Sequence, residues 1–187
     1  MTGVSLVLGG HRRTLAQPSA LGRRDTLAAI ASSIGSSESL DLYALAGERS
    51  HQVMRRFRDQ WLTGFEESAD EYEFPQYSVR PDAVYGSPWQ LIDRLLAEPT
   101  QPHSLYWRNP RPGHVLHAML FFTTDGGLIV GLTVTTEDPD LAATTLRLLA
   151  KSVDARYSYS AWEQPPPDTA SEFEAKARRA EDPRLLP

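Results

Sequence analysis

Residues 115–135 read VLHAMLFFTTDGGLIVGLTVT and contain the clearest structural signal in the chain. Two runs rich in aliphatic and β-branched residues, Val115 to Thr123 and Leu128 to Thr135, flank the stretch Thr124-Asp125-Gly126-Gly127. An Asp-Gly step between two such runs accommodates the positive φ angles of a tight hairpin turn. This stretch therefore predicts two antiparallel strands.

The residues after the hairpin predict a helix. Asp138 and Pro139 are typical of a helix start, because Asp caps the first free N–H groups and Pro suits the first helical position. Within this helix, Leu141, Leu148 and Leu149 are expected to face the hairpin.

Residues 156–162 then predict a strand, and the prolines at 165–167 interrupt regular structure. Thr169 and Glu172 form a capping-box pattern for a further helix that carries Phe173 and Ala177.

Upstream of the hairpin, residues 40–45 predict a strand, and a helix is expected from about Glu48. Large apolar residues recur there every four positions and predict a buried stripe made of Val53, Phe57, Trp61 and Phe65.

A second upstream helix is expected from Ser87, with Pro88 in its first position and Gln90 completing a capping box. Residues 104–107 predict a strand. Near the N-terminus, residues 4–8 indicate a strand and residues 25–35 a short amphipathic helix.

This order of elements predicts an α+β fold with an antiparallel or mixed sheet covered by several helices. The 187 residues fit one domain, 1–187, in which residues 1–24 and 180–187 are expected to form loose ends.

Composition narrows the functional classes. The chain has no cysteine, which excludes disulfides, thiolate zinc sites, iron–sulfur clusters and a cysteine nucleophile. The net charge of −5 argues against nucleic-acid binding. No apolar run approaches the ~20 residues that span a bilayer, and no export signal is visible, so we expect a cytoplasmic protein without membrane contact.

No pattern in the sequence predicts a cofactor or a metal. His114 and His117 form an H-x-x-H pair, but residues three apart in a strand face opposite sides of a sheet. The spacings of a P-loop, a dinucleotide-binding loop, a nucleophile elbow and a zinc-protease helix are all missing. A catalytic site would therefore have to be assembled from scattered residues.

One segment combines carboxylates with aromatic rings, and we call residues 66–77 the acidic aromatic segment. Such a surface can cover a basic region of another protein, although a solvated connection between two helices explains the same pattern. The residues expected to contact a partner are Glu66, Glu67, Asp70, Glu71, Tyr72, Glu73 and Tyr77.

A second candidate is the stretch 106–112, which reads YWRNPRP and combines ring faces with guanidinium groups. Trp107 and Arg108 are its expected partner contacts. The alternative interpretation is a strand end that runs into a loop fixed by prolines.

Residues 121–132, followed by Tyr157 to Trp162 and the stretch Glu163-Gln164-Pro165-Pro166-Pro167, resemble bacterial immunity proteins, the antidotes to polymorphic or contact-dependent toxins. The resemblance extends from Ser87 to Ala177. It implies a non-catalytic cytoplasmic inhibitor that binds a cognate toxin domain and occludes its active site. It assigns no individual residues.

Two other functions stay open at this point. One is a structural or regulatory interaction domain, such as a homodimer that uses the 106–112 loop. The other is an enzyme whose pocket gathers His114 or His117 with Glu163 or other acids.

Overall fold

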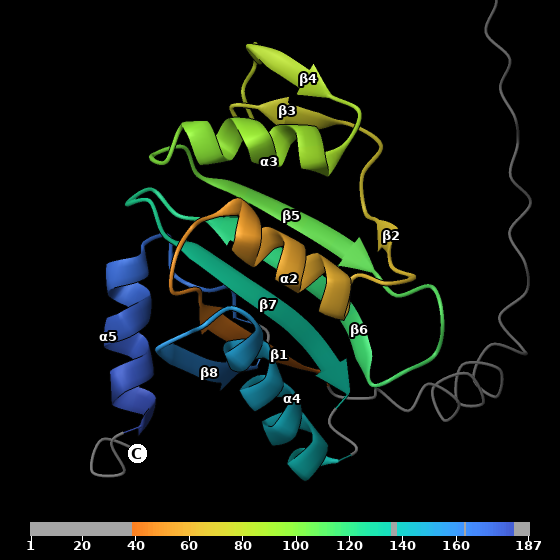
Figure 1. The fold of residues 1–187 in the computed structure, drawn as a ribbon, viewed down its shortest axis with the longest axis vertical. Helices are drawn as coiled ribbons and strands as arrows, with labels where there is room; N and C mark the ends of the chain where they lie inside the picture. Colours follow the sequence, from red (N-terminus) through yellow and green to blue (C-terminus); the bar gives the residue numbers. More distant parts are fainter. Residues whose placement is uncertain (1–38, 136–137, 163, 182–187) are drawn as a thin grey trace, which may run out of the picture. The chain divides into compact units, whose positions relative to one another are not determined.

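Six strands form the central sheet of the computed structural model, which describes residues 39–135, 138–162 and 164–181 (Figure 1). The strands are β1 (Ser39–Leu45), β2 (Glu66–Glu67), β5 (His103–Arg108), β6 (Val115–Phe122), β7 (Leu128–Thr135) and β8 (Tyr157–Ala161), in the spatial order β2-β5-β6-β7-β1-β8. Strands β3 (Tyr72–Phe74) and β4 (Ala83–Tyr85) form a second, two-stranded sheet. The helices are α2 (His51–Trp61), α3 (Pro88–Ala97), α4 (Pro139–Ser152) and α5 (Ala170–Glu181). The predicted α+β class is confirmed, and every strand pair is antiparallel.

The β6–β7 hairpin forms as predicted. Phe122 pairs with Leu128 across the turn. Gly126 has a φ angle of 87°, which is the left-handed conformation that glycine adopts without steric cost. The Gly127 N–H donates to Thr123 Oγ1 at 2.7 Å and closes the turn.

Strand β1 lies between β7 and β8, so β8, the strand predicted at residues 156–162, does not pair with the hairpin. Leu42 on β1 is opposite Leu132 on β7 and Ser160 on β8. Helix α4 connects β7 to β8, and the two strands run parallel with β1 between them.

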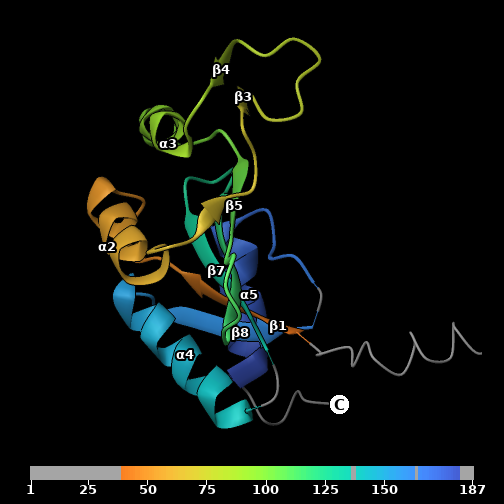
Figure 2. The same ribbon diagram turned by 90° about the vertical axis from the view of Figure 1, so that its right-hand side faces the viewer.

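The two faces of the sheet have different coverings. Helices α2 and α4 lie on one side of it (Figure 2), where their buried residues and those of α3 pack on alternate strand residues such as Leu42, Leu120 and Leu132. On the other side, α5 supplies Phe173 and Ala177 to a smaller cluster with Tyr43 and Tyr159. No helix in the described ranges is long and apolar enough to cross a membrane.

Helix α2 starts later and ends earlier than predicted. Ser50 caps it by accepting a hydrogen bond from the Val53 N–H at 3.3 Å. Val53 and Phe57 are fully buried, as expected of the stripe. The helix ends at Trp61, and Gly64 has a φ angle of 80°, so Phe65 lies beyond the helix.

The prediction that Leu141 and Leu148 face the hairpin is wrong. These side chains are 42% and 46% exposed, whereas Leu149 is fully buried. The buried face of α4 is formed by Ala142, Thr145, Leu149 and Ser152. Leu141 and Leu148 each precede a residue of that face by one position, and one position rotates a helical side chain by about 100°.

The remaining helix starts match their predictions closely. Asp138 accepts hydrogen bonds at the start of α4, and Thr169 Oγ1 accepts one from the Glu172 N–H at 3.1 Å in α5. In α3, Ser87 accepts from the Trp89 N–H rather than from that of Gln90. Residues 180 and 181 belong to α5, while the predictions for residues 1–38 and 182–187 lie outside the described residues.

Candidate protein-binding surface

The acidic aromatic segment forms strands rather than a plain connection between helices. Glu66 on β2 is opposite Arg108 on β5, and Tyr72 on β3 is opposite Tyr85 on β4. The segment therefore runs along the outer edge of β5. This brings it beside Tyr106, the first residue of the second candidate stretch.

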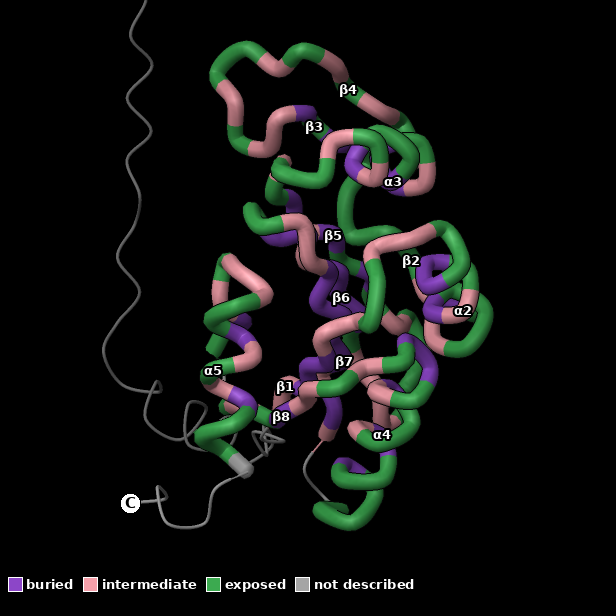
Figure 3. The backbone as a smooth tube through the Cα atoms, turned by 60° about the vertical axis from the view of Figure 1, so that its left-hand side comes forward, coloured by how far each residue is buried: buried purple, intermediate pink, exposed green. Residues whose placement is uncertain are grey.

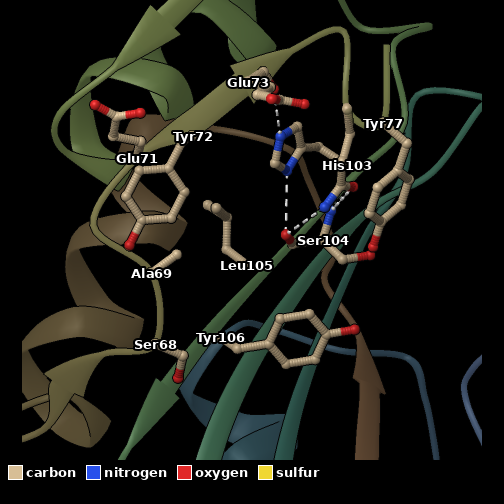
Figure 4. Close-up of a pocket in the computed structure, with 11 residues that line it drawn as sticks. Ser68, Ala69, Glu71, Tyr72, Glu73, Tyr77, His103, Ser104, Leu105 and Tyr106 are labelled. Atoms are coloured by element: carbon tan, nitrogen blue, oxygen red, sulfur yellow. Dashed lines mark hydrogen bonds between the residues drawn. The ribbon is translucent and has the colours of Figure 1, made fainter. Parts of the chain in front are cut away.

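A groove of about 300 Å³ lies between this segment and β5 (Figure 4). We call it the tyrosine groove. Its lining consists of Ser68, Ala69, Glu71, Tyr72, Glu73, Gln76, Tyr77, His103, Ser104, Leu105 and Tyr106.

Three tyrosines contribute rings to this lining, with very different exposure. Tyr72 is buried, and its hydroxyl lies 3.4 Å from Glu67 Oε2. Burial, followed by the negative charges of Glu67 and Asp70, raises the pKa of Tyr72 to about 12. Tyr77 is 85% exposed and Tyr106 is 41% exposed. A partner can therefore reach the rings of Tyr77 and Tyr106 without unfolding the groove.

The side chain of Gln76 joins the acidic aromatic segment to β5. The Ser104 N–H donates to Gln76 Oε1 at 2.8 Å, and Gln76 Nε2 donates to the Ser104 carbonyl at 3.2 Å. The amide thus pairs with the edge of β5 in the way that a neighbouring strand would. This fixes the wall of the groove.

His103 forms a buried part of the lining. Its Nδ1 lies 3.1 Å from the Ser104 carbonyl oxygen, and its Nε2 lies 3.0 Å from the Glu73 carbonyl oxygen. Burial lowers the pKa of His103, although both carbonyl contacts favour the protonated ring. The ring is therefore neutral near pH 7 and has a single N–H, which can donate to one of the two carbonyls. Donation from Nε2 to Glu73 would connect β3 to β5.

The negative charge of the chain is concentrated here. Residues 66–85 contain six acidic residues and one arginine, a formal charge of −5 that equals the net charge of the entire chain. The rest of the sequence is balanced. Arg108 neutralises one carboxylate through a 2.8 Å ion pair with Glu66, whereas Asp70, Glu71 and Glu73 are exposed and have no ion pair within the described residues.

Exposed apolar side chains lie next to these carboxylates. The loop between β3 and β4 carries Tyr77 and Val79, and Val79 is 99% exposed. Figure 3 shows that this loop contains no buried position. Tyr77 also has a φ angle of 60°, a conformation uncommon for a residue other than glycine. Its ring is displayed at the surface despite this backbone cost.

Trp107 is not part of the contact surface predicted for it. Its side chain is 3% exposed and packs against Trp89, with 6.1 Å between ring centroids. Side chains alternate along a strand, so Trp107 faces the helices while Tyr106 and Arg108 face the opposite side. Arg108 is exposed as expected, but it is paired with Glu66.

The loop that follows β5 is organised internally. The Asn109 side chain donates to the Val115 carbonyl at 3.0 Å and accepts from the Arg111 N–H at 3.0 Å. A strand end that runs into a fixed loop is the interpretation that this arrangement supports.

The two histidines of the H-x-x-H pair have different surroundings. His114 lies within hydrogen-bond distance of Thr145 on α4, at 3.2 Å, whereas His117 is exposed between Arg108 and Thr133 of the neighbouring strands. Neither histidine lines the tyrosine groove. Across the described ranges, no three His, Asp or Glu side chains are grouped so that they could hold a metal ion.

A second groove lies between α4 and the β1–β8 edge of the sheet. It has a volume of about 340 Å³ and a mainly aliphatic lining that includes Leu42, Leu146 and the half-exposed Trp162. None of its lining residues is charged. Its chemistry therefore specifies no class of ligand, in contrast to the tyrosine groove.

No family model matches the chain, and no curated protein or solved structure matches it either. The lining residues that were not among the predicted partner contacts are Ser68, Ala69, Gln76, His103, Ser104, Leu105 and Tyr106. Side chains alternate between the two faces of a strand, and this pattern along 103–108 could have predicted Tyr106 rather than Trp107 as the exposed aromatic contact.

Proposed function

We propose that the protein is a non-catalytic inhibitor that binds the basic surface of a cognate protein toxin and occludes its active site. The acidic face, which we define as residues 66–85 together with Tyr106, is the contact surface. This proposal corresponds to the function of the immunity proteins that the sequence resembles.

One observation carries the proposal: residues 66–85 have a formal charge of −5, equal to the net charge of the chain, and exposed uncharged side chains lie beside these carboxylates. Charge of one sign on a surface steers a partner of opposite charge and raises the association rate. Exposed aromatic side chains supply the contacts that hold the partner after encounter. Tyr77 and Tyr106 are the exposed aromatic side chains, and the aliphatic Val79 adds an exposed apolar contact.

The geometry also suits occlusion of a site rather than turnover of a small molecule. The buried histidine of the tyrosine groove lies between two main-chain carbonyls, and its single N–H can donate to one of them. The side chains of Asp70, Glu71 and Glu73 are exposed to solvent at the rim of this groove. A surface of this kind covers a partner instead of enclosing a substrate.

The test is a growth rescue with the protein encoded by the neighbouring gene. Cells that express this neighbour are expected to stop growing, and co-expression of the wild-type chain is expected to restore growth. The triple variant Glu67→Lys, Asp70→Lys, Glu71→Lys should lose the rescue, because like charges across an interface repel.

A matched control reverses three exposed carboxylates on other elements: Asp93→Lys on α3, Asp140→Lys on α4 and Glu172→Lys on α5. This variant should rescue as the wild type does. Equal rescue by both triple variants would reject the acidic face as the binding surface. A neighbour that does not slow growth, or that the wild-type chain fails to neutralise, would reject the inhibitor function.

A further inference from the structure

The tyrosine groove combines exposed aromatic rings with a buried apolar floor. Tyr77 and Tyr106 supply the exposed rings, while the buried Tyr72 and Leu105 form part of the floor (Figure 4). The rings come from β3, from the loop after it and from β5. Tyr106 is held in place by an edge-to-face contact with Phe121, with 5.8 Å between centroids. The volume of about 300 Å³ admits one long side chain.

The charged residues around the tyrosine groove favour a cation. Glu71 and Glu73 contribute to the lining, and Asp70 is adjacent in the sequence. Among the described residues, no lysine or arginine lines the groove. The one titratable base in the lining, His103, is buried and has a lowered pKa, so it adds no positive charge near pH 7.

We propose that the tyrosine groove seats an arginine side chain of the partner protein. This inference rests on the proposed function and names the group that the acidic face recognises. The aromatic faces attract a cation through the ring quadrupole, and the surrounding carboxylates add to the attraction. A guanidinium group is planar and weakly hydrated, so it stacks on a tyrosine ring at a lower desolvation cost than an ammonium group.

The conformation of Tyr77 supports this assignment. A tyrosine with a φ angle of 60° is held against its backbone preference, and such positions concentrate at ligand clamps. Hydrogen bonds fix the loop around it, because Ser78 Oγ donates to the Arg80 carbonyl at 2.9 Å and accepts from the Arg80 N–H at 3.2 Å. These bonds stabilise the backbone of the loop that carries the ring.

The test is an NMR titration of the full chain with three capped pentapeptides. One has the sequence Gly-Gly-Arg-Gly-Gly, the second replaces arginine by citrulline, and the third replaces it by lysine. Citrulline has the shape of arginine without its charge. We expect the arginine peptide to shift the amide signals of Tyr77, Ser104 and Tyr106 with a Kd on the order of millimolar. The citrulline peptide should give at least about a tenfold weaker response, and the lysine peptide an intermediate one.

Two variants localise the binding. Tyr77→Ala removes a ring that is 85% exposed and should raise the Kd of the arginine peptide at least about fivefold. Trp162→Ala removes an exposed ring outside the groove and should leave the affinity unchanged. The inference is overturned if arginine and citrulline shift the same signals equally, if the shifts map elsewhere, or if about 10 mM arginine peptide gives none.

The outcomes also separate this inference from the proposed function. Growth rescue that depends on the acidic face, combined with no peptide binding, rejects the arginine site and leaves the inhibitor function in place. If the arginine peptide binds in the groove but growth is not rescued, the arginine site is supported and the toxin is rejected as the partner.

Discussion

Asp125, in the turn of the β6–β7 hairpin, accepts a 2.9 Å hydrogen bond from the N–H of Ala170, the first residue of α5. The same carboxylate accepts from the Ser171 N–H at 3.2 Å and from Thr123 Oγ1 at 2.6 Å. A residue of the central hairpin thus caps a helix that begins 45 positions later. The turn therefore stabilises the hairpin and also the position of α5, the helix that covers the second face of the sheet.

Asp125→Asn is expected to lower the free energy of unfolding by roughly 1 kcal/mol at pH 7. The amide keeps one acceptor oxygen but loses the charge that favours a helix N-terminus and strengthens the hydrogen bonds. Urea denaturation measures the effect. Asp168→Asn is the control, because its side chain is exposed close to the same helix end and makes no side-chain hydrogen bond within the described residues. If Asp168→Asn lowered the free energy of unfolding as much as Asp125→Asn does, the effect would come from charge alone and not from the hydrogen bonds of Asp125.

The contribution of Asp125 should depend on pH. Burial alone would raise the pKa of this carboxyl, but hydrogen bonds from Thr123, Ala170 and Ser171 together lower it from 3.8 to about 2. Because the folded pKa lies below the unfolded one, the stabilisation is present above about pH 4 and is lost as the pH falls toward 2. The side chain is exposed, so we expect roughly 1 kcal/mol rather than the full value of the shift. Denaturation curves at several pH values should show wild type and Asp125→Asn converging near pH 2. A constant difference would contradict this account.

Gly127→Ala should destabilise the protein by roughly 2 kcal/mol. A Cβ at this position would lie 2.6 Å from the Ala170 Cβ and 2.9 Å from Thr123 Oγ1, so α5 or the turn must move. Gly86→Ala is the matched control, because its Cβ would meet no atom within 4 Å. Thermal unfolding of the two variants checks this difference, and equal melting temperatures would show that α5 does not pack on the turn as described.

Gln76→Ala should remove the two side-chain hydrogen bonds at the edge of β5. The variant leaves the Ser104 N–H and carbonyl without their side-chain partner, at a cost of roughly 1–2 kcal/mol, and the Ser104 amide should exchange with solvent faster. Hydrogen exchange followed by NMR measures this amide directly. Gln90→Ala, at an exposed position of α3, should change neither quantity. Unchanged exchange at Ser104 in Gln76→Ala would mean that the glutamine does not fix the groove wall.

The local parts of the fold could be predicted from the sequence, because their signals lie within a few residues. The Asp125-Gly126 turn and the caps at Asp138 and Thr169 are examples. The insertion of β1 between β7 and β8 could not be predicted, since strand order depends on contacts across the whole chain.

The candidate site was predictable only in part. The acidic aromatic segment was identified from composition, but its position against Tyr106 depends on the pairing of Glu66 with Arg108, 42 residues away. The burial of Trp107 follows from strand alternation once the neighbouring apolar Leu105 is assigned to the core. His103 and Gln76 carry no local signal, because their roles arise from main-chain groups brought close by the fold.

The most direct test of the acidic face is the affinity of the chain for the purified protein encoded by the neighbouring gene. Binding kinetics would compare wild type with Asp70→Asn, Glu71→Gln, Glu73→Gln and with a control triple variant, Asp93→Asn, Asp140→Asn, Glu172→Gln. We predict that the first triple variant raises the Kd at least about tenfold, mainly by slower association, and that its Kd depends less on salt. The control triple variant should stay within about twofold of wild type. Equal affinities for the two triple variants, or no binding by the wild type, would contradict the account.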